Sequence, residues 1–522
     1  MSKLSEVSRR RPADVENNIV TLCQGTFECS SLAQAPGIRA LLLALLGACL
    51  GMSGCITAAD AVAPTAVEME SSKSAVSAIQ LADPAMDAEI EGYASATSVN
   101  RGEDIKLFVN TKEPSYTIDV FRVGWYGGRG MERVAPTIAR HGLAQAPPII
   151  DSASGLIECD WQDPYVLHVP DSPDPKVWQS GIYVARLTAG SSGKQNYIVF
   201  VVRDDQRSSD LLFQSSVTTY QAYNDWGGRS LYSKPRATKV SFNRPYLHGH
   251  GTGHLLYWEL SMVQFLEKEG YDVTYTTDVD THARGELLSL HKAFLSVGHD
   301  EYWSWKMRDN VEAARDNGVN LGFFGSNVGY WQIRFDASAF TGDPNRTIIC
   351  YKNVSADPLS HSDDPIQRRL TTVKFRSHPV DRPEDALVGV MYESDPVQSE
   401  IVISDASNWI FKGTGLKNGD HLTNLLGYEV DRSSDHTPPG AQRIAHSPYP
   451  FRGGTRYSDM TVYTAPSGSI VVATGTMQWG WGLVDPEMQG KKFENTAVQI
   501  ATRNILRRFG ARTGVFTTDA AQ

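Results

Sequence analysis

The chain has 522 residues, of which 41% are hydrophobic and 21% are charged, which is enough apolar material for at least two cores. Its formal net charge of −10 argues against a nucleic-acid partner, because binding to phosphates requires a basic face. Aromatic residues make up 10% of the chain, which favours a β-rich fold over a coiled coil or disorder.

Residues 39–55 have the layout of a bacterial export signal. Arg39 precedes about a dozen apolar residues, which end at Met52-Ser53-Gly54-Cys55. These last four residues resemble a lipobox, which predicts that Cys55 carries a lipid; the alternative is plain secretion after Ala58 or Ala59. We therefore expect an exported protein that meets the membrane only through a lipid anchor, or else is secreted or periplasmic. Residues 1–55 would be its leader, and the Ala/Ser-rich residues 56–85 a flexible tether.

Residues 86–204 show short alternating runs of apolar and polar residues, separated by turns. No stretch carries a convincing helical period, so the pattern predicts a β-sandwich of immunoglobulin-like type. The clearest expected strands are Ile90–Val99, Ile105–Asn110, Thr117–Trp125, Tyr165–Val169, Gly181–Leu187 and Gln195–Val202.

The pattern changes after Asp210, where strands and helices begin to alternate. Leu211–Val217 is a continuous apolar run, typical of a strand in a parallel sheet that is covered on both faces. This alternation predicts a doubly wound α/β domain over residues 205–512, with a β-rich extension at 330–485 and a tail at 513–522. The expected elements are a helix at 253–270, strands at 271–276 and 293–297, a helix at 300–317, a strand at 319–324 and a closing helix at 493–509.

Unusual polar residues follow three of the expected strands, in segments 218–228, 298–304 and 325–331. Ligands bind at the carboxyl ends of the strands in such sheets, so we expect the functional site there. His299 and Glu301 are two residues apart and should project to the same side of an extended strand tip, where they could bind a metal or transfer protons. Asp300, between them, is placed to cap the following helix.

Several sequence runs resemble the C-terminal domain of the N,N-dimethylformamidase large subunit. The most specific is Gly298-His299-Asp300-Glu301-Tyr302-Trp303-Ser304. The others are Tyr220 to Trp226, Val240 to Tyr246, Gly270 to Val273 and Asn320 to Phe324. The resemblance implies a core like that of class I glutamine amidotransferases. It also implies one iron ion, held by two tyrosines and a glutamate, that activates water for amide hydrolysis.

The resemblance assigns roles to individual residues. Glu301 would be the carboxylate ligand of a mononuclear, ferric iron. One tyrosine ligand would be Tyr220 or Tyr223, with Tyr220 favoured by its spacing from Glu301. The second tyrosine ligand would be Tyr183. His299 and Asn327 would position water or polarise the amide carbonyl, and Glu429 could be a general base.

The family's large subunit pairs with a small subunit, and nothing in this chain resembles that partner. We therefore leave the small-subunit partner open, and a homo-oligomer is also compatible with the sequence. The expected substrate is a small amide, which need not be dimethylformamide itself.

Three other interpretations compete. A serine or cysteine hydrolase would need a nucleophile where His299-Asp300-Glu301 stands, and the body of the chain has only Cys159 and Cys350, which could instead form a disulfide. The loop that holds His248, His250 and His254 could bind zinc, nickel or an anion. The third interpretation is a non-enzymatic lipoprotein that binds carbohydrate or another surface ligand through Trp331, Trp479 and Trp481.

Overall fold

The computed structural model describes residues 79–174, 176–247, 251–486 and 492–514. The chain divides into two units, 1–73 and 74–522, and every described residue belongs to the second. The predicted leader, Cys55, most of the tether, His248 and His250 lie outside the described residues. Within the described ranges, no helix combines the length and the apolar character needed to cross a membrane. The described part is a mixed α/β structure with several sheets.

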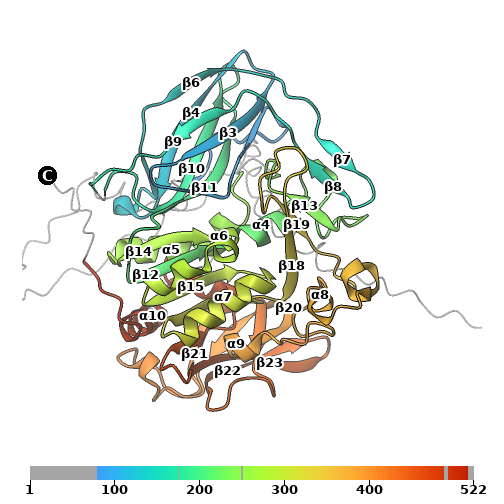
Figure 1. The fold of residues 1–522 in the computed structure, drawn as a ribbon. Coiled ribbons are helices and arrows are strands. Elements are labelled where there is room, and N and C mark those ends of the chain that lie inside the picture. The colour runs from blue at the N-terminus through green and yellow to red at the C-terminus, as the bar shows by residue number, and fades with distance from the viewer. Residues whose placement is uncertain (1–78, 175, 248–250, 487–491, 515–522) are drawn as a thin grey trace, which may run out of the picture. The chain divides into compact units, whose positions relative to one another are not determined.

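The N-terminal part consists of two sheets that pack face to face (Figure 1). Alternate residues of both sheets fill one core, which includes Leu107 from the first sheet and Tyr183 and Phe200 from the second. The first sheet has the order β1 (Ile90–Ala94), β3 (Asp104–Thr111), β9 (Tyr165–His168). The second has the order β2 (Ser98–Asn100), β11 (Gln195–Arg203), β10 (Gly181–Ala189), β4 (Ser115–Val123), β5 (Met131–Arg133), and β6 (Ile138–His141) also pairs with β4. A separate hairpin joins β7 (Ile149–Asp151) to β8 (Leu156–Glu158).

The segment that the sequence predicts as one strand, Ile90–Val99, forms two strands in different sheets. β1 pairs antiparallel with β3, whereas β2 pairs parallel with β11. The chain therefore crosses between the two sheets near Ser95. The sandwich arrangement agrees with the alternation in the sequence, while its immunoglobulin-like type and the amidotransferase-like type of the second part stay predictions.

A seven-stranded sheet forms the centre of the second part. Its order is β14 (Val273–Thr277), β12 (Leu211–Ser215), β15 (Ala293–His299), β17 (Asn320–Ser326), β24 (Ile470–Ala473), β23 (Gly454–Thr464), β22 (Gln442–Phe451). The first five strands are parallel, and the last two continue the sheet in antiparallel order. β12 is buried along its whole length, as its continuous apolar sequence predicts.

Helices cover both faces of this sheet. Met307 and Val311 of α7 (Trp305–Asp316) pack with Phe294 and Phe323 on one face. Phe509, at the end of α10 (Thr496–Arg508), approaches Gly322 on the other. The remaining helices of this region are α4 (Val217–Tyr223), η3 (Trp226–Gly228), the π-helix η4 (Leu255–Glu259), α5 (Leu260–Lys268), α6 (Asp278–Ala283) and η5 (Gly285–Leu290).

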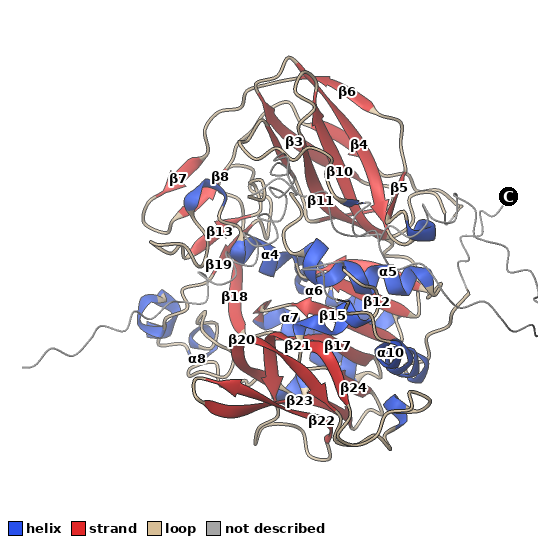
Figure 2. Ribbon diagram, turned by 180° about the vertical axis from the view of Figure 1, so that it is seen from behind, coloured by secondary structure: helices blue, strands red, loops and turns tan. Residues whose placement is uncertain are grey.

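The β-rich extension lies beside β17 and the end of β15 (Figure 2). It contains a four-stranded sheet of order β13 (Lys239–Ser241), β19 (Thr347–Ile349), β18 (Trp331–Asp336), β16 (Tyr302–Ser304), and a long pair formed by β20 (Met391–Val402) and β21 (His421–Arg432). Its short helices are η6 (Val354–Ala356), η7 (Pro358–His361), α8 (Pro365–Arg368), α9 (Asp385–Val388), η8 (Trp409–Phe411) and η9 (Met477–Gly482). In the N-terminal part, η2 (Tyr126–Gly128) precedes β5.

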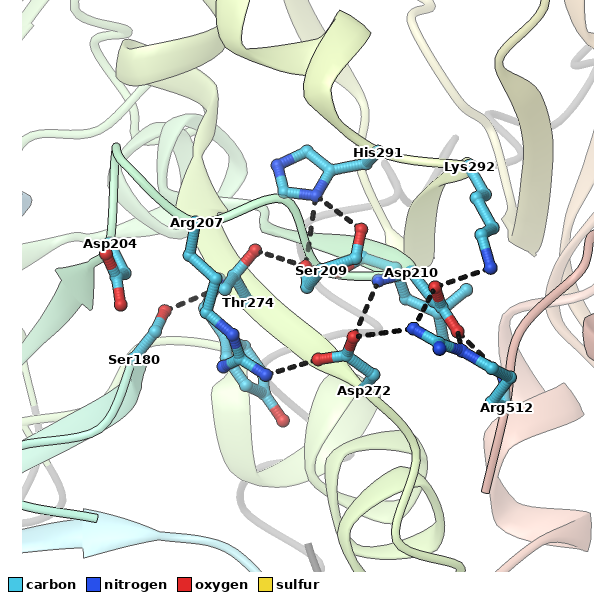
Figure 3. A network of polar contacts seen from close by, with 12 residues as sticks. Ser180, Asp204, Arg207, Ser209, Asp210, Asp272, Thr274, His291, Lys292 and Arg512 are labelled. Atoms are coloured by element: carbon cyan, nitrogen blue, oxygen red, sulfur yellow. Dashed lines mark hydrogen bonds and ion pairs between the residues drawn. The ribbon is translucent and has the colours of Figure 1, made fainter. Parts of the chain in front are cut away.

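A charged network ties together the amino ends of the parallel strands (Figure 3). Asp210, just before β12, accepts a 2.9 Å hydrogen bond from Nε of Arg512 and lies 2.7 Å from Nζ of Lys292, just before β15. Arg207 pairs with Asp272, just before β14. These ionic contacts hold the C-terminal segment to the sheet and occupy its amino edge. The opposite edge, where the parallel strands end, is where the predicted polar segments lie.

The two parts are joined by a buried ion pair. Arg122 on β4 is 3% exposed, and its Nη2 lies 2.6 Å from Oε1 of Glu267 on α5. The hydroxyl of Ser180 accepts a 2.9 Å hydrogen bond from the backbone N–H of Tyr275 on β14. These two contacts join the N-terminal sheets to α5 and β14 of the second part. Breaking the ion pair would leave a buried charge without compensation.

Candidate functional site

The site is centred on the carboxylate of Glu301. β15 ends at His299 and β16 begins at Tyr302, so Glu301 lies in the short connection between two strands, where it is 2% exposed. The hydroxyl of Tyr223 donates to Oε2 of Glu301 at 2.8 Å. The hydroxyl of Tyr232 lies 3.0 Å from each of the two carboxylate oxygens. Two phenols therefore converge on one buried carboxylate.

Both tyrosines come from one segment that folds back on itself. Tyr223 ends α4, and the chain then turns through η3, where Gly227 has φ 75°, a value that most residues with a Cβ avoid. The turn returns Tyr232 to Tyr223, and their rings stack with centroids 4.2 Å apart. Arg244 supports the turn by donating to the carbonyl oxygens of Asn224, Trp226 and Arg229.

His299 and Glu429 adjoin this carboxylate. Nε2 of His299 lies 3.4 Å from Oε2 of Glu301, so the two side chains share one side of the strand tip, as their spacing predicts. The same Nε2 lies 3.6 Å from Oε2 of Glu429, which β21 contributes from the extension. His299 is 1% exposed and Glu429 is 4% exposed. An imidazole is thus held between two buried carboxylates, an arrangement that can hold and move a proton.

Charged neighbours keep Glu301 ionised. Burial acts to raise the pKa of Glu301, but the hydrogen bond and charge of His299 and the charge of Lys352 outweigh burial and leave the pKa below its usual value. Nζ of Lys352 donates to the hydroxyl of Tyr302, and that hydroxyl donates to the hydroxyl of Tyr232. Burial, together with the neighbouring Glu301, raises the pKa of Tyr302 well above its usual value. A continuous hydrogen-bonded chain therefore runs from Lys352 to Glu301.

Asn327 follows β17 on the adjacent strand end. Its backbone N–H donates to Oδ1 of Asp431 at 2.8 Å, and the hydroxyl of Ser326 donates to the same oxygen at 2.9 Å. Asn327 has φ 58°, a left-handed conformation that asparagine tolerates better than most residues. Its Oδ1 is buried and has no hydrogen-bond partner among the described residues. A buried amide oxygen of this kind is available to a ligand or to water.

His254 is a further imidazole at the site. Its ring centroid lies 5.1 Å from that of Tyr223 and 5.7 Å from that of His299. The preceding residue, Gly253, has φ 57°, and a Cβ at this position would lie 2.7 Å from the Cβ of Tyr220. A glycine here therefore lets the backbone before His254 pack against Tyr220. Of the three histidines that the sequence groups as a metal-binding loop, His254 is described, and it lies beside the Glu301 site.

The hydroxyls of Tyr220 and Tyr183 make their contacts away from Glu301, so their assignment as ligands stays a prediction from the sequence. Tyr220 lies one helical turn before Tyr223, and its hydroxyl lies 3.1 Å from the hydroxyl of Ser215, beside Glu259. Tyr183 faces the core of the first two sheets, stacked between Trp178 and Phe200, and donates to the carbonyl oxygen of Gln179 at 2.6 Å.

Asp300 is not the cap of α7. It is buried, with Oδ1 accepting from the indole of Trp303 and Oδ2 from Ser296 and Gln214. The chain stays extended as β16 from Tyr302 to Ser304 before α7 begins. Ser304 is therefore the N-cap of α7, and its hydroxyl accepts from the N–H of Met307 at 3.1 Å.

The structure also places the residues of the competing interpretations. Cys159 and Cys350 are buried free thiols, so they form no disulfide. Trp479 and Trp481 are 0% and 7% exposed, which leaves little indole surface for stacking on a sugar. Trp331 lies under the ammonium of Lys352, with Nζ 4.8 Å from the ring centroid.

Two residues at the site, Tyr232 and Lys352, were not anticipated from the sequence. Tyr232 lies in a segment rich in turns, 226–238, which has no periodic signal. Lys352 has φ 56° in a loop after β19, far from Glu301 in the sequence. The one available signal is Gly227-Gly228, which indicates a tight turn that could return Tyr232 to Tyr223.

A family comparison identifies the relationship. The family model described as "N,N-dimethylformamidase beta subunit-like, C-terminal" matches residues 117–495, which is more than half of the chain. The chain belongs to this family. Comparison with curated proteins gives no match. The matched range of this dimethylformamidase beta subunit-like chain contains the whole of the site, from Tyr223 to Glu429.

The family resemblance implies an iron ion, and the donor atoms at the site fit it. Among the described residues, no three His, Cys, Asp or Glu side chains gather as metal ligands. The donors here are instead the phenol oxygens of Tyr223 and Tyr232, which meet the ionised carboxylate of Glu301. Hard, anionic oxygen ligands of this kind suit ferric iron. The family suggests an amidase-like function for the chain.

Proposed function

We propose that this protein hydrolyses the C–N bond of a small amide at the Glu301 site, with a mononuclear ferric iron held by Tyr223, Tyr232 and Glu301. The observation that supports this most directly is the convergence of two phenol hydroxyls on one buried carboxylate, at 2.8 and 3.0 Å. The membership of the chain in the dimethylformamidase beta subunit-like family supports an amide as substrate.

When bound, such an iron supplies Lewis-acid chemistry, by polarising a carbonyl oxygen and lowering the pKa of a water molecule. The protein's own residues handle the proton. The carboxylate of Glu429 accepts the proton of the attacking water. His299, whose Nε2 is 3.6 Å from that carboxylate, delivers a proton to the departing amine nitrogen. The carboxamide of Asn327, whose backbone N–H donates to Asp431, orients the amide.

Lys352 has an electrostatic role in this proposal. Its ammonium donates to Tyr302 and lies 3.5 Å from the ring centroid of Tyr232, so it favours the ionised form of that phenol. Because Tyr302 accepts from the ammonium and donates to the hydroxyl of Tyr232, this chain stabilises negative charge on the Tyr232 oxygen.

Because the family is named for a beta subunit, we also propose that the chain works in an assembly. Its partner could be a small subunit or a second copy of the chain. The molecular mass of the purified protein in solution, measured by light scattering, separates these two arrangements.

Metal analysis and visible spectroscopy test the iron site. We expect the purified full chain to contain close to one iron per chain and to show a tyrosinate charge-transfer band. Tyr223→Phe, Tyr232→Phe and Glu301→Gln should each lose the band and the hydrolysis of small formamides and acetamides. Tyr220→Phe, which keeps a buried aromatic ring beside Glu259, is the matched control and should retain both. A folded wild-type protein without iron and without amidase activity would overturn the proposal.

A further inference from the structure

Away from the Glu301 site, two buried arginines line one small cavity. Arg244 and Arg346 are 2% and 5% exposed. The cavity has a volume of about 30 Å³, and its wall also includes Tyr246, Gln221 of α4 and backbone from Gly92 to Thr97. It therefore lies where the first β-sheets meet the second part of the chain.

Among the described residues, no carboxylate forms an ion pair with either guanidinium. Nε and Nη2 of Arg346 donate to Oδ1 of Asn243 and the carbonyl oxygen of Ala94, both at 2.8 Å. Both Nη atoms of Arg244 donate to backbone carbonyl oxygens at 2.8–3.2 Å. These acceptors are all neutral, and the acidic groups nearby, Asp225 for Arg244 and Asp343 and Glu158 for Arg346, act on the guanidiniums only through their charge. Burial lowers the pKa of each arginine to about 10, which reflects the cost of keeping them charged.

Three side-chain groups at the cavity that can donate have no hydrogen-bond partner in the described part of the chain. Nε of Arg244 is buried without a hydrogen-bond partner in the described part of the chain. Nη1 of Arg346 and the hydroxyl of Tyr246 also make no hydrogen bond to the described residues. A guanidinium has no acceptor atom, so a wall of this composition favours an anion over a cation or an apolar group.

We propose that the cavity binds one chloride ion, held by Arg244, Arg346 and Tyr246. A space of about 30 Å³ holds one or two species of the size of water, which suits a single monatomic anion. A single negative charge offsets part of the charge of the two guanidiniums.

The position of Arg244 links this ion to the Glu301 site. Arg244 holds the backbone of residues 224–229, which separate Tyr223 from Tyr232. An ion that keeps Arg244 charged and in place therefore stabilises the turn that brings the two tyrosines together. The chloride site itself does not depend on iron or on amidase activity.

Bromide substitution tests the site directly. Crystals of the full chain grown in sodium bromide should show one anomalous peak in the cavity, in contact with the guanidiniums of Arg244 and Arg346 and the hydroxyl of Tyr246. A cavity that contains only water at high bromide concentration would overturn the proposal.

Thermal unfolding provides a second test. At constant ionic strength, replacing gluconate by chloride should raise the melting temperature along a saturable curve. Arg346→Met could fail to fold, so the variant of choice is Tyr246→Phe, which removes one donor and keeps the ring. It should need roughly tenfold more chloride for the same rise, the effect of one lost hydrogen bond to a charged group. Tyr457→Phe, at an exposed tyrosine, is the control. Equal melting temperatures in chloride and gluconate would contradict the proposal.

Discussion

The imidazole rings of His254 and His299 lie nearly parallel, with centroids 5.7 Å apart and an angle of 11° between their planes. Burial, with a smaller contribution from the charge of His299, lowers the pKa of His254 to about 3. Two adjacent imidazoles rarely both carry a charge, and here His254 is the one that stays neutral near pH 7. His299, the other ring of the pair, lies between the carboxylates of Glu301 and Glu429.

Replacing His254 should change the response of the protein to acid. Its folded pKa lies below the ordinary value of 6.5, so the unfolded chain takes up a proton first as the pH falls. The free energy of unfolding should therefore decrease from pH 6.5 towards pH 3, by at most about 1.4 kcal/mol per pH unit from this one group. We expect His254→Asn to flatten that slope in urea titrations at pH 7, 5 and 4. His378→Asn, at an exposed histidine, is the control. The same slope in His254→Asn and the wild type would refute the assignment.

Lys352 should matter for turnover more than for folding. Lys352→Met keeps the length of the side chain and removes the ammonium that donates to Tyr302. We expect kcat for a small amide to decrease on the order of 100-fold, with a shifted tyrosinate band. Lys374→Met is the matched control, because Lys374 also lies over aromatic rings, those of Tyr330 and Trp331. Equal losses in both variants would indicate a general effect on packing.

The buried carboxylate of Glu259 lies beside the hydroxyl of Tyr220, and the raised pKa of Glu259 makes a testable prediction about stability. The π-helix η4 places the Glu259 carboxylate against the start of α4, where it accepts from the N–H of Ser216 at 2.8 Å and from the hydroxyl of Ser215 at 3.0 Å. Burial raises the pKa of Glu259 from 4.5 to about 7. The folded protein therefore holds a proton that the unfolded chain has released between these values, and stability should fall as the pH rises through this window.

In Glu259→Gln this loss should disappear, because the amide cannot ionise. Chemical denaturation at pH 5, 6, 7 and 8 measures it, with Glu286→Gln at an exposed glutamate as the control. The difference in slope between the wild type and Glu259→Gln should be at most about 1.4 kcal/mol per pH unit. A wild-type stability that does not change over this range would disprove the raised pKa.

Periodicity predicted those parts of the structure in which the backbone is regular. The fully apolar run at Leu211 indicated a buried parallel strand, and the two-residue spacing of His299 and Glu301 placed both side chains on one side. The same rule was available for Tyr183. It alternates with Ala185 and Leu187 along β10, and all three face the core of the first two sheets.

The remainder of the site depends on turns and on distant segments, which periodicity does not describe. Tyr220 and Tyr223 are three positions apart, and only the tertiary structure shows that the hydroxyl of Tyr220 lies beside Glu259 while that of Tyr223 contacts Glu301. Tyr232 returns through a turn that contains Gly227, and Lys352 comes from a loop after β19. Long-range contacts of this kind arise from tertiary packing, so apart from the turn at Gly227-Gly228 no local pattern in the sequence indicates them.

The two thiols of the described part should be unreactive in the folded protein. Burial raises the pKa of Cys350 to about 12 and raises that of Cys159 further, so neither forms thiolate near neutral pH. We expect iodoacetamide at pH 8 to modify these two cysteines only after denaturation, with peptide mass spectrometry as the readout. Recovery of a Cys159–Cys350 linked peptide from non-reduced protein would contradict the free thiols.

The continuity of the seven-stranded sheet also has a mechanical consequence. β24 pairs with β17 in parallel and with β23 in antiparallel order, so β22, β23 and β24 form one sheet with the strands that precede Glu301 and Asn327 (Figure 2). Glu429 lies outside this sheet, on β21 of the separate β20–β21 pair. A continuous sheet of this kind has no hinge between β17 and β24. A chain cut after β17 would therefore expose a long unpaired edge that invites aggregation.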